Sequence, residues 1–202
     1  TSTKLFDPAE PAAVELRPVS RPDELPSYLE MLLSPERRVD LADAAAAHAA
    51  VGEDYLLEFW LGLPFFDWVA EAVGFEEAVF YFAEADEGAL RDLRDRYAAM
   101  LDDLIDRVSA QTQFESFVLG CSASCTSLLG TSLWRQWDKP LISAVAARVH
   151  ERGKLLHLHF HGRSAEAAAD FVETGVDCVC PFERPPGGDV EGLEGLRAIR
   201  RA

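Results

Sequence analysis

Strand-like and helix-like segments alternate along this 202-residue chain, and this alternation limits the possible folds more than any other feature of the sequence. Short apolar runs typical of buried strands are separated by longer runs with the spacing of amphipathic helices. Such an order predicts a parallel sheet with its connecting helices packed outside it. The expected strands cover residues 14–19, 54–62, 115–121, 154–161 and 176–182.

The helices expected between these strands cover residues 22–33, 41–51, 65–74 and about 88–109, with others from near Asp138 to Gly153, from Ser164 and from about Val190. Asp138 is a good helix cap and Pro140 is tolerated in a first turn, so this pair predicts a helix start. The Asp and Arg residues of the helix over 88–109 are expected on a solvated face. About five strands are too few to close an eight-stranded barrel, which needs about 250 residues. A doubly wound sheet and a (β/α)8 barrel therefore both remain open.

The composition limits the cellular compartment and the classes of binding partner that are expected for this protein. Hydrophobic residues make up 49% of the chain, which indicates a globular domain. The formal net charge of -16 argues against nucleic acid and anionic membrane surfaces as partners, and no apolar run is long enough to span a bilayer. The four cysteines fall into two close pairs, which favours a reducing, cytoplasmic setting with free or ligating thiols.

Polar and reactive residues recur after the expected strands, where α/β folds gather their chemistry. Glu58 and Cys121 are the expected substrate contacts, and Glu183 follows the last strand. Cys178 and Cys180 lie within that strand and are expected to be small buried hydrophobes. No dinucleotide fingerprint or phosphate-binding loop motif occurs in the sequence.

The stretch KLLHLHFHGRS, residues 154–164, holds three of the five histidines at alternate positions. Along a strand His157, His159 and His161 therefore share one face, opposite the intervening apolar residues. The α-carbons of His159 and His161 are about 6.6 Å apart, so their rings can converge on one ion, whereas His157 is about 13 Å from His161. The row predicts a metal or catalytic site; hydrogen-bonded imidazoles without a metal are the alternative.

Residues 115–190 resemble the uroporphyrinogen decarboxylase superfamily, which includes tetrapyrrole decarboxylases and zinc-dependent, corrinoid-linked methyltransferases. The resemblance rests on the small-residue loop from Gly120 to Gly130, on Trp137 and Pro140 before "HERGK", and on "LHLHFHG". The His-x-Cys-Gly of methyltransferase-like members corresponds to His159 to Gly162, with His161 at the Cys position. The loop "PFERPPGGDV" resembles the family stretch Glu-x-Pro-Pro-x-Gly-Asp, with matches at Glu183, Pro185, Pro186, Gly188 and Asp189.

The resemblance implies a (β/α)8 barrel of which residues 1–202 form a single domain lacking N-terminal and C-terminal portions. It favours a methyltransferase with zinc on His159 and His161, which moves a methyl group between a corrinoid and a thiol. Glu183 and His157 are then the expected catalytic residues. Glu183 either orients a histidine or is a third zinc ligand, for which Cys121 and Cys125 are the other candidates in this sequence. A porphyrinogen decarboxylase and a non-catalytic ligand-binding barrel are the alternatives. The implied partners are a small-molecule substrate, a corrinoid protein and, because five strands leave open sheet edges, a second copy of the chain.

Overall fold

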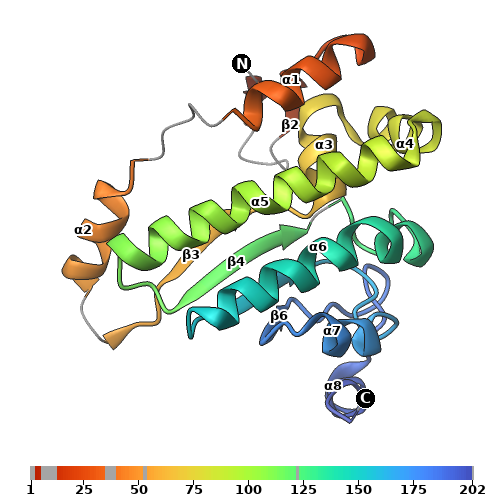
Figure 1. The fold of residues 1–202 in the computed structure, drawn as a ribbon. Helices are drawn as coiled ribbons and strands as arrows, with labels where there is room; N and C mark the ends of the chain where they lie inside the picture. Colours follow the sequence, from red (N-terminus) through yellow and green to blue (C-terminus); the bar gives the residue numbers. More distant parts are fainter. Residues whose placement is uncertain (1–2, 6–12, 35–39, 52–53, 122, 202) are drawn as a thin grey trace.

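The computed structural model describes residues 3–5, 13–34, 40–51, 54–121 and 123–201 (Figure 1). Its main sheet has four parallel strands in the order β3-β4-β5-β6, with bounds Glu58–Gly62, Ser116–Cys121, Leu155–Phe160 and Cys178–Cys180. A separate antiparallel pair is formed by β1 (Thr3–Leu5) and β2 (Ala13–Leu16). The expected strand over 14–19 therefore belongs to this pair and not to the main sheet, and the parallel sheet remains open.

Helices precede, connect and follow the parallel strands. They are η1 (Pro22–Glu24), α1 (Leu25–Leu32), α2 (Ala42–Val51), α3 (Phe65–Val73), α4 (Phe75–Glu84), α5 (Glu87–Gln111), α6 (Thr131–Glu151), α7 (Ala168–Thr174) and α8 (Gly192–Ile199). The expected α/β order is confirmed, whereas α4 was not expected from the sequence. Within the described residues, no helix combines the length and apolar character needed to cross a membrane.

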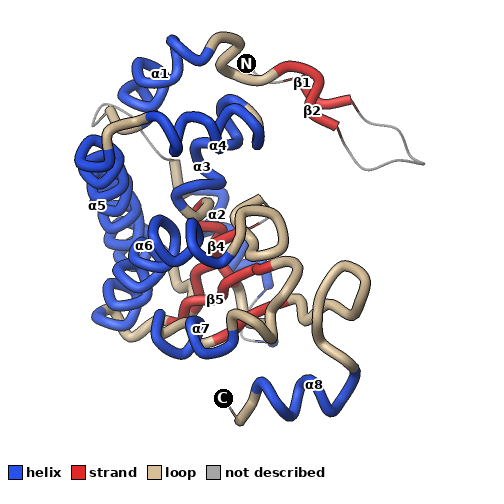
Figure 2. Tube along the Cα trace, turned by 90° about the vertical axis from the view of Figure 1, so that its right-hand side faces the viewer, coloured by secondary structure: helices blue, strands red, loops and turns tan. Residues whose placement is uncertain are grey.

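The two faces of the parallel sheet differ in what covers them. Helices α5 and α6 run side by side across one face, where they contact β3 and β5 (Figures 1 and 2). Leu156, Leu158 and Phe160 of β5 point to this side and are completely buried. The opposite face carries His157 and His159, both partly exposed, and is called the open face below.

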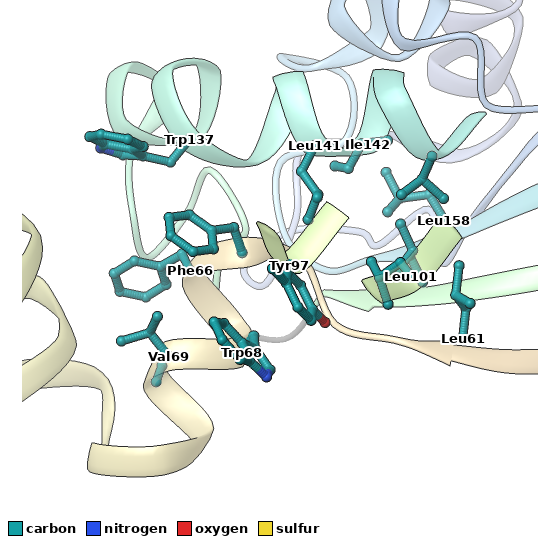
Figure 3. Packing of buried hydrophobic residues seen from close by; sticks show 14 of the residues in the cluster. Leu61, Phe66, Trp68, Val69, Tyr97, Leu101, Trp137, Leu141, Ile142 and Leu158 are labelled. Carbon is teal, nitrogen blue, oxygen red and sulfur yellow. The ribbon is translucent and has the colours of Figure 1, made fainter. Parts of the chain in front are cut away.

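The hydrophobic core lies between the sheet and these helices (Figure 3). The ring of Tyr97 on α5 stacks on Trp68 of α3, with centroids 4.3 Å apart. Its hydroxyl donates to the carbonyl of Leu63 at 2.9 Å, which satisfies the polar end of a buried ring. Trp134 and Trp137 on α6 are also buried, so both tryptophans belong to the packing.

Helix α6 begins at Thr131, about two turns before the predicted start at Asp138. Asp138 is buried inside the helix, where its carboxylate accepts a hydrogen bond from the backbone N–H of Phe66 at 2.8 Å. It therefore caps the N-terminus of α3 instead of its own helix. Pro140 lies in the interior of α6.

Charged residues of α5 lie mostly on the expected solvated face, and some of them also pair with neighbouring helices. Arg148 of α6 binds Asp102 at 2.6 Å, and Arg152 also contacts Asp102, at 3.3 Å. Arg96 of α5 pairs with Glu30 of α1 at 2.6 Å. These ion pairs help to set the positions of α1 and α6 against α5.

Candidate functional site

The strand register brings histidines and cysteines together on the open face. His157 lies opposite Cys178 in the register between β5 and β6, and His159 lies opposite Cys180. On the other side His159 is level with Gly120 of β4. Because residues in register on neighbouring strands share a face, these side chains form one polar row across the open face.

Glu58 and His157 form one end of this row. The carboxylate of Glu58 lies 3.0 Å from Nδ1 of His157, and the hydroxyl of Ser116 donates to the same carboxylate at 2.9 Å. Glu58 is the first residue of β3, so the expectation that it follows a strand is wrong. Its hydrogen-bond partners are Ser116 and His157, and its predicted contact with substrate stays a prediction.

Cys180 connects His157 to His159. Its sulfur lies 2.9 Å from Nε2 of His157 and 3.4 Å from Nδ1 of His159. Cys180 is half-buried and Cys178 is exposed, so neither thiol is the fully buried small hydrophobe expected from the sequence. Cys180 is the central member of the row.

His159 and His161 lie at the carboxyl end of β5 with their rings nearly perpendicular. Their Nε2 atoms are 2.9 Å apart, and the ring centroids are 4.6 Å apart. Burial lowers the pKa of His159, and the nearby His161 and His157 lower it further. An uncharged His159 is the form that can donate a lone pair to a metal ion.

Glu183 closes the other end of the row. Its Oε1 lies 3.1 Å from Nδ1 of His161, and its Oε2 accepts the backbone N–H of Gly162 at 2.5 Å. The hydrogen bond from Gly162 and then the contact with His161 lower the pKa of Glu183. Gly162 has φ of +83°, and a Cβ there would meet Ser127 Oγ at 2.2 Å, so this turn requires glycine.

The Pro/Gly loop after β6 is held by its own motif residues. A Cβ on Gly188 would lie 2.3 Å from the carbonyl oxygen of Glu183, so the loop can pass that close only with glycine. The carboxylate of Asp189 accepts the backbone N–H groups of Ala165 and Glu166, each at 2.9 Å. The two hydrogen bonds to Asp189 fix the loop that carries Glu183 against the segment after β5.

The hydrogen-bond partners of His159 and His161 are consistent with the following arrangement of their protons. Ionised Glu183 only accepts, so His161 carries its proton on Nδ1. Cys180 accepts from Nδ1 of His159 when its own proton is directed at His157. Both Nε2 atoms then have lone pairs that face each other across 2.9 Å. Two lone pairs at this distance repel unless a proton or a metal ion lies between them.

The fit of this pair to a metal ion is partial. His159 and His161 supply two nitrogen donors, but no group of three or more His, Cys, Asp or Glu side chains that could hold a metal ion is found among the described residues. Both oxygens of Glu183 accept hydrogen bonds, an arrangement that suits a residue orienting His161; its role as a third ligand stays a prediction. Cys121 ends β4 opposite Phe160, and its side chain lies outside the described part of the structure. Its predicted role stays a prediction.

Asp67 holds the loop that follows β4 in place. This carboxylate accepts the backbone N–H groups of Ala123 and Ser124 at 2.8 and 3.0 Å. Cys125, another candidate ligand from the sequence, is 2% exposed, and burial raises the pKa of its thiol. It belongs to the buried core, with its sulfur near the turn at Gly162.

An aromatic ring borders the row on the side of β3. Trp60 is 56% exposed, and its ring lies across Gly120, where an added Cβ would meet it at 2.1 Å. The absence of a side chain at residue 120 therefore lets the indole extend over this part of the open face, where Gly120 is level with His159. A separate cavity of about 610 Å³ lies between α1, β3 and α5 and is not lined by the histidines.

Sequence reasoning found most members of the row but missed two. His157, His159, His161, Glu58 and Glu183 were expected at a site, and the structure brings all five into one hydrogen-bonded series. Cys180 and Ser116 were not expected there. The signal for Cys180 was available, because C-x-C on a neighbouring parallel strand repeats the alternation of the histidines.

Comparisons with known proteins give a likeness of fold. A methyltransferase from Methanosarcina mazei has a similar structure, with a TM-score of 0.56, 14% sequence identity and coverage of 94% of this chain. The match spans 55% of the methyltransferase chain. No protein-family model and no curated protein matches the sequence. At this sequence identity the likeness shows a shared fold, and any argument about activity has to come from the residues of the site.

Proposed function

We propose that the protein is a methyltransferase of the uroporphyrinogen decarboxylase type, which binds zinc between His159 and His161 and transfers a methyl group between a corrinoid and a thiol. The observation that carries the proposal is the 2.9 Å approach of two Nε2 atoms whose Nδ1 atoms are both hydrogen-bonded. Hydrogen bonding of the second ring nitrogen is the usual way in which proteins orient histidine ligands. The fold shared with a methyltransferase supports the reaction class.

The chain's own residues have distinct parts in this reaction. Glu183 keeps the proton of His161 on Nδ1, and Cys180 does the same for His159, so both Nε2 atoms stay available as ligands. Zinc, when bound, lowers the pKa of a substrate thiol and holds the thiolate for attack on the methyl group. The exposed ring of Trp60 gives an apolar wall beside the pair. Catalytic zinc usually has three protein ligands, so binding through two is expected to be weak unless a further side chain joins them.

The charge of the open face does not suit the decarboxylase alternative. Glu58 and Glu183 place two carboxylates in the row, and the chain carries a formal net charge of -16. A porphyrinogen with eight carboxylates would meet repulsion here unless cations from elsewhere offset it. A thiol substrate meets no such cost.

Zinc content of the purified protein tests the proposal. Wild type dialysed without chelator should retain zinc, and the double variant His159→Ala, His161→Ala should lose it. His150→Ala is the matched control, because His150 lies on α6 against Asp177 at 2.9 Å and should leave zinc content unchanged. Glu183→Gln should weaken zinc binding roughly 10- to 100-fold in a chelator competition, since it removes an orienting acceptor.

Activity is tested with methylcobalamin and a small thiol, followed by the visible spectrum of the corrinoid. Demethylation should require zinc and should be lost in the double variant. Equal zinc in wild type and double variant, or none in wild type, would leave a shared proton between the rings and refute the metal site. Zinc binding without methyl transfer would favour the ligand-binding alternative.

A further inference from the structure

Three groups on three strands form a second arrangement on the open face. Glu58 Oε2 lies 3.0 Å from His157 Nδ1, and His157 Nε2 lies 2.9 Å from the sulfur of Cys180. The side chains of His157 and Glu58 are 16% and 32% exposed, so water competes only in part for these contacts. The order carboxylate, imidazole, thiol is the order in which proteins activate a cysteine nucleophile.

The protons of this series follow from the acceptors. The carboxylate of Glu58 also accepts the hydroxyl of Ser116 at 2.9 Å, which fixes its position in front of Nδ1. His157 then donates from Nδ1 and keeps a lone pair on Nε2, which faces the thiol of Cys180. The imidazole is therefore set to accept the proton of this thiol.

We propose that Cys180 is a nucleophilic thiol that attacks soft electrophiles at saturated carbon, with His157 as its base and Glu58 as the positioning residue. The sulfur forms a bond to carbon while the bond from that carbon to its leaving group breaks. The leaving group departs with the electron pair of the broken bond. The proton of the thiol passes to Nε2 of His157, and Glu58 stabilises the resulting imidazolium.

The surroundings favour alkyl transfer over acyl transfer. An acyl intermediate needs hydrogen-bond donors for its oxyanion, and such donors are often backbone N–H groups next to the nucleophile. The residue after Cys180 is Pro181, which has no N–H. Substitution at saturated carbon develops no oxyanion and does not need one.

Cys178 is a natural control in the same molecule. It lies two residues away on the same strand and is more exposed than Cys180, and no hydrogen bond from its sulfur to a histidine is found among the described residues. Burial raises the pKa of both thiols, and the carboxylate of Glu58 contributes to each shift. Contact with His157 is therefore the feature that distinguishes them.

The inference does not depend on zinc and goes beyond the proposed methyl transfer. Protein is treated with chelator, reacted with iodoacetamide at one neutral pH, and analysed by mass spectrometry for the rate at each cysteine. The variants Cys178→Ser and Cys180→Ser assign the two rates, because both residues fall in one tryptic peptide. Cys180 should react roughly 10-fold or more faster than the more exposed Cys178.

Changes to the base and to the positioning residue complete the test. His157→Ala should remove the advantage of Cys180, and added free imidazole should restore part of it, which a merely structural role of His157 would not allow. Glu58→Gln should slow Cys180, whereas Cys178 should react slightly faster because the variant removes a carboxylate that raises its pKa; a loosened fold would speed both. Failure of imidazole to restore the rate would overturn the role of His157 as base. In wild type alone, a rate at Cys180 equal to or below that at Cys178 overturns the inference, whether or not zinc binds.

Discussion

Individual carboxyl groups in this protein differ in the direction in which their surroundings shift the pKa. Glu183 accepts two hydrogen bonds at the surface, and these lower its pKa through Gly162 first and His161 second. Asp138 is fully buried, and burial raises its pKa well above the ordinary value for aspartate, with Asp67 nearby adding to the shift. One of the Asp138 oxygens has no hydrogen-bond partner among the described residues. The surroundings of Glu183 favour its ionised form, whereas burial disfavours the ionised form of Asp138.

Replacement of Asp138 by asparagine is predicted to stabilise the protein at neutral pH. A carboxyl whose folded pKa is raised favours folding fully below its unfolded pKa of about 3.9, and this contribution is lost as the pH rises through the folded value. Asparagine keeps an oxygen for the N–H of Phe66 and cannot ionise. Urea unfolding between pH 4 and 8 should therefore show an advantage of Asp138→Asn that grows with pH.

The control is Asp67→Ala, which removes the acceptor of two backbone N–H groups from the loop after β4. Asp67 accepts from Ala123 and Ser124, so this variant should be destabilised at every pH by roughly 1–3 kcal/mol. A stability difference between Asp138→Asn and wild type that stays constant across the pH range would show that Asp138 is ionised in the fold.

At this scale the sequence predicted residues whose partners are near in the chain or repeat a local pattern. The alternation of His157, His159 and His161 is visible in the sequence because a strand has a period of two. The position of Asp138 was misjudged, because its partner Phe66 is 72 residues away and only packing brings α3 to α6. The importance of Cys180 depends on the register between β5 and β6, which no single strand specifies.

Among the elements, α6 and α7 are joined by a compact charge cluster. Asp170 of α7 has a side chain only 6% exposed and receives Arg135 and Lys139 of α6 at 2.9 and 2.7 Å. Burial alone would raise the pKa of Asp170, but the hydrogen bonds from Arg135 and Lys139 outweigh it and the pKa is lowered. This cluster anchors α7, a helix of only 7 residues that leads into β6.

Substitution Asp170→Asn is predicted to destabilise the protein by about 1–3 kcal/mol at neutral pH, because it removes the negative charge that pairs with two cations and one of the two acceptor oxygens. A lowered folded pKa gives stability that is present above the unfolded pKa and is lost as the pH falls through the folded value. Wild type and variant should therefore converge in stability at low pH in denaturant titrations. Glu173→Gln is the control, since Glu173 is 66% exposed and shares only Lys139. An equal loss in both variants would contradict the burial argument.

Element boundaries show where sequence reasoning succeeded and where it failed. The long helix α5 was predicted closely because its apolar residues keep helical spacing over the whole length. The start of α6 was misplaced because Asp138 and Pro140 resemble a helix start, although the helix begins at Thr131 after Gly130. Tertiary packing of Trp134 and Trp137 extends the helix beyond what local signals indicate.

For the whole molecule, acidic charge is the dominant long-range feature. The chain has 35 Asp and Glu residues against 19 Lys and Arg residues. Mutual repulsion of like charges disfavours the compact state and is screened within about 10 Å at 0.1 M salt. The melting temperature is therefore predicted to rise with sodium chloride in a thermal shift series.

Potassium chloride should give the same rise, which separates screening from binding of one particular ion. A fall in melting temperature with salt would contradict the prediction and would show that the ion pairs between α5 and α6 contribute more than the net repulsion.

The parallel α/β architecture was predictable from segment order alone, and the four parallel strands confirm it. Closure into a barrel stays a prediction, since the described strands form an open sheet.

The alternation of side chains along β5 also determines how this protein can change over generations. Substitution at His157 or His159 alters one group and leaves the others in place. Insertion or deletion of one residue within β5 would instead turn the whole row into the layer packed against α6 and bring Leu156 and Leu158 to the open face. The chemistry of the row can therefore drift by point mutation, while changes in chain length are tolerated only in the loops outside the strand.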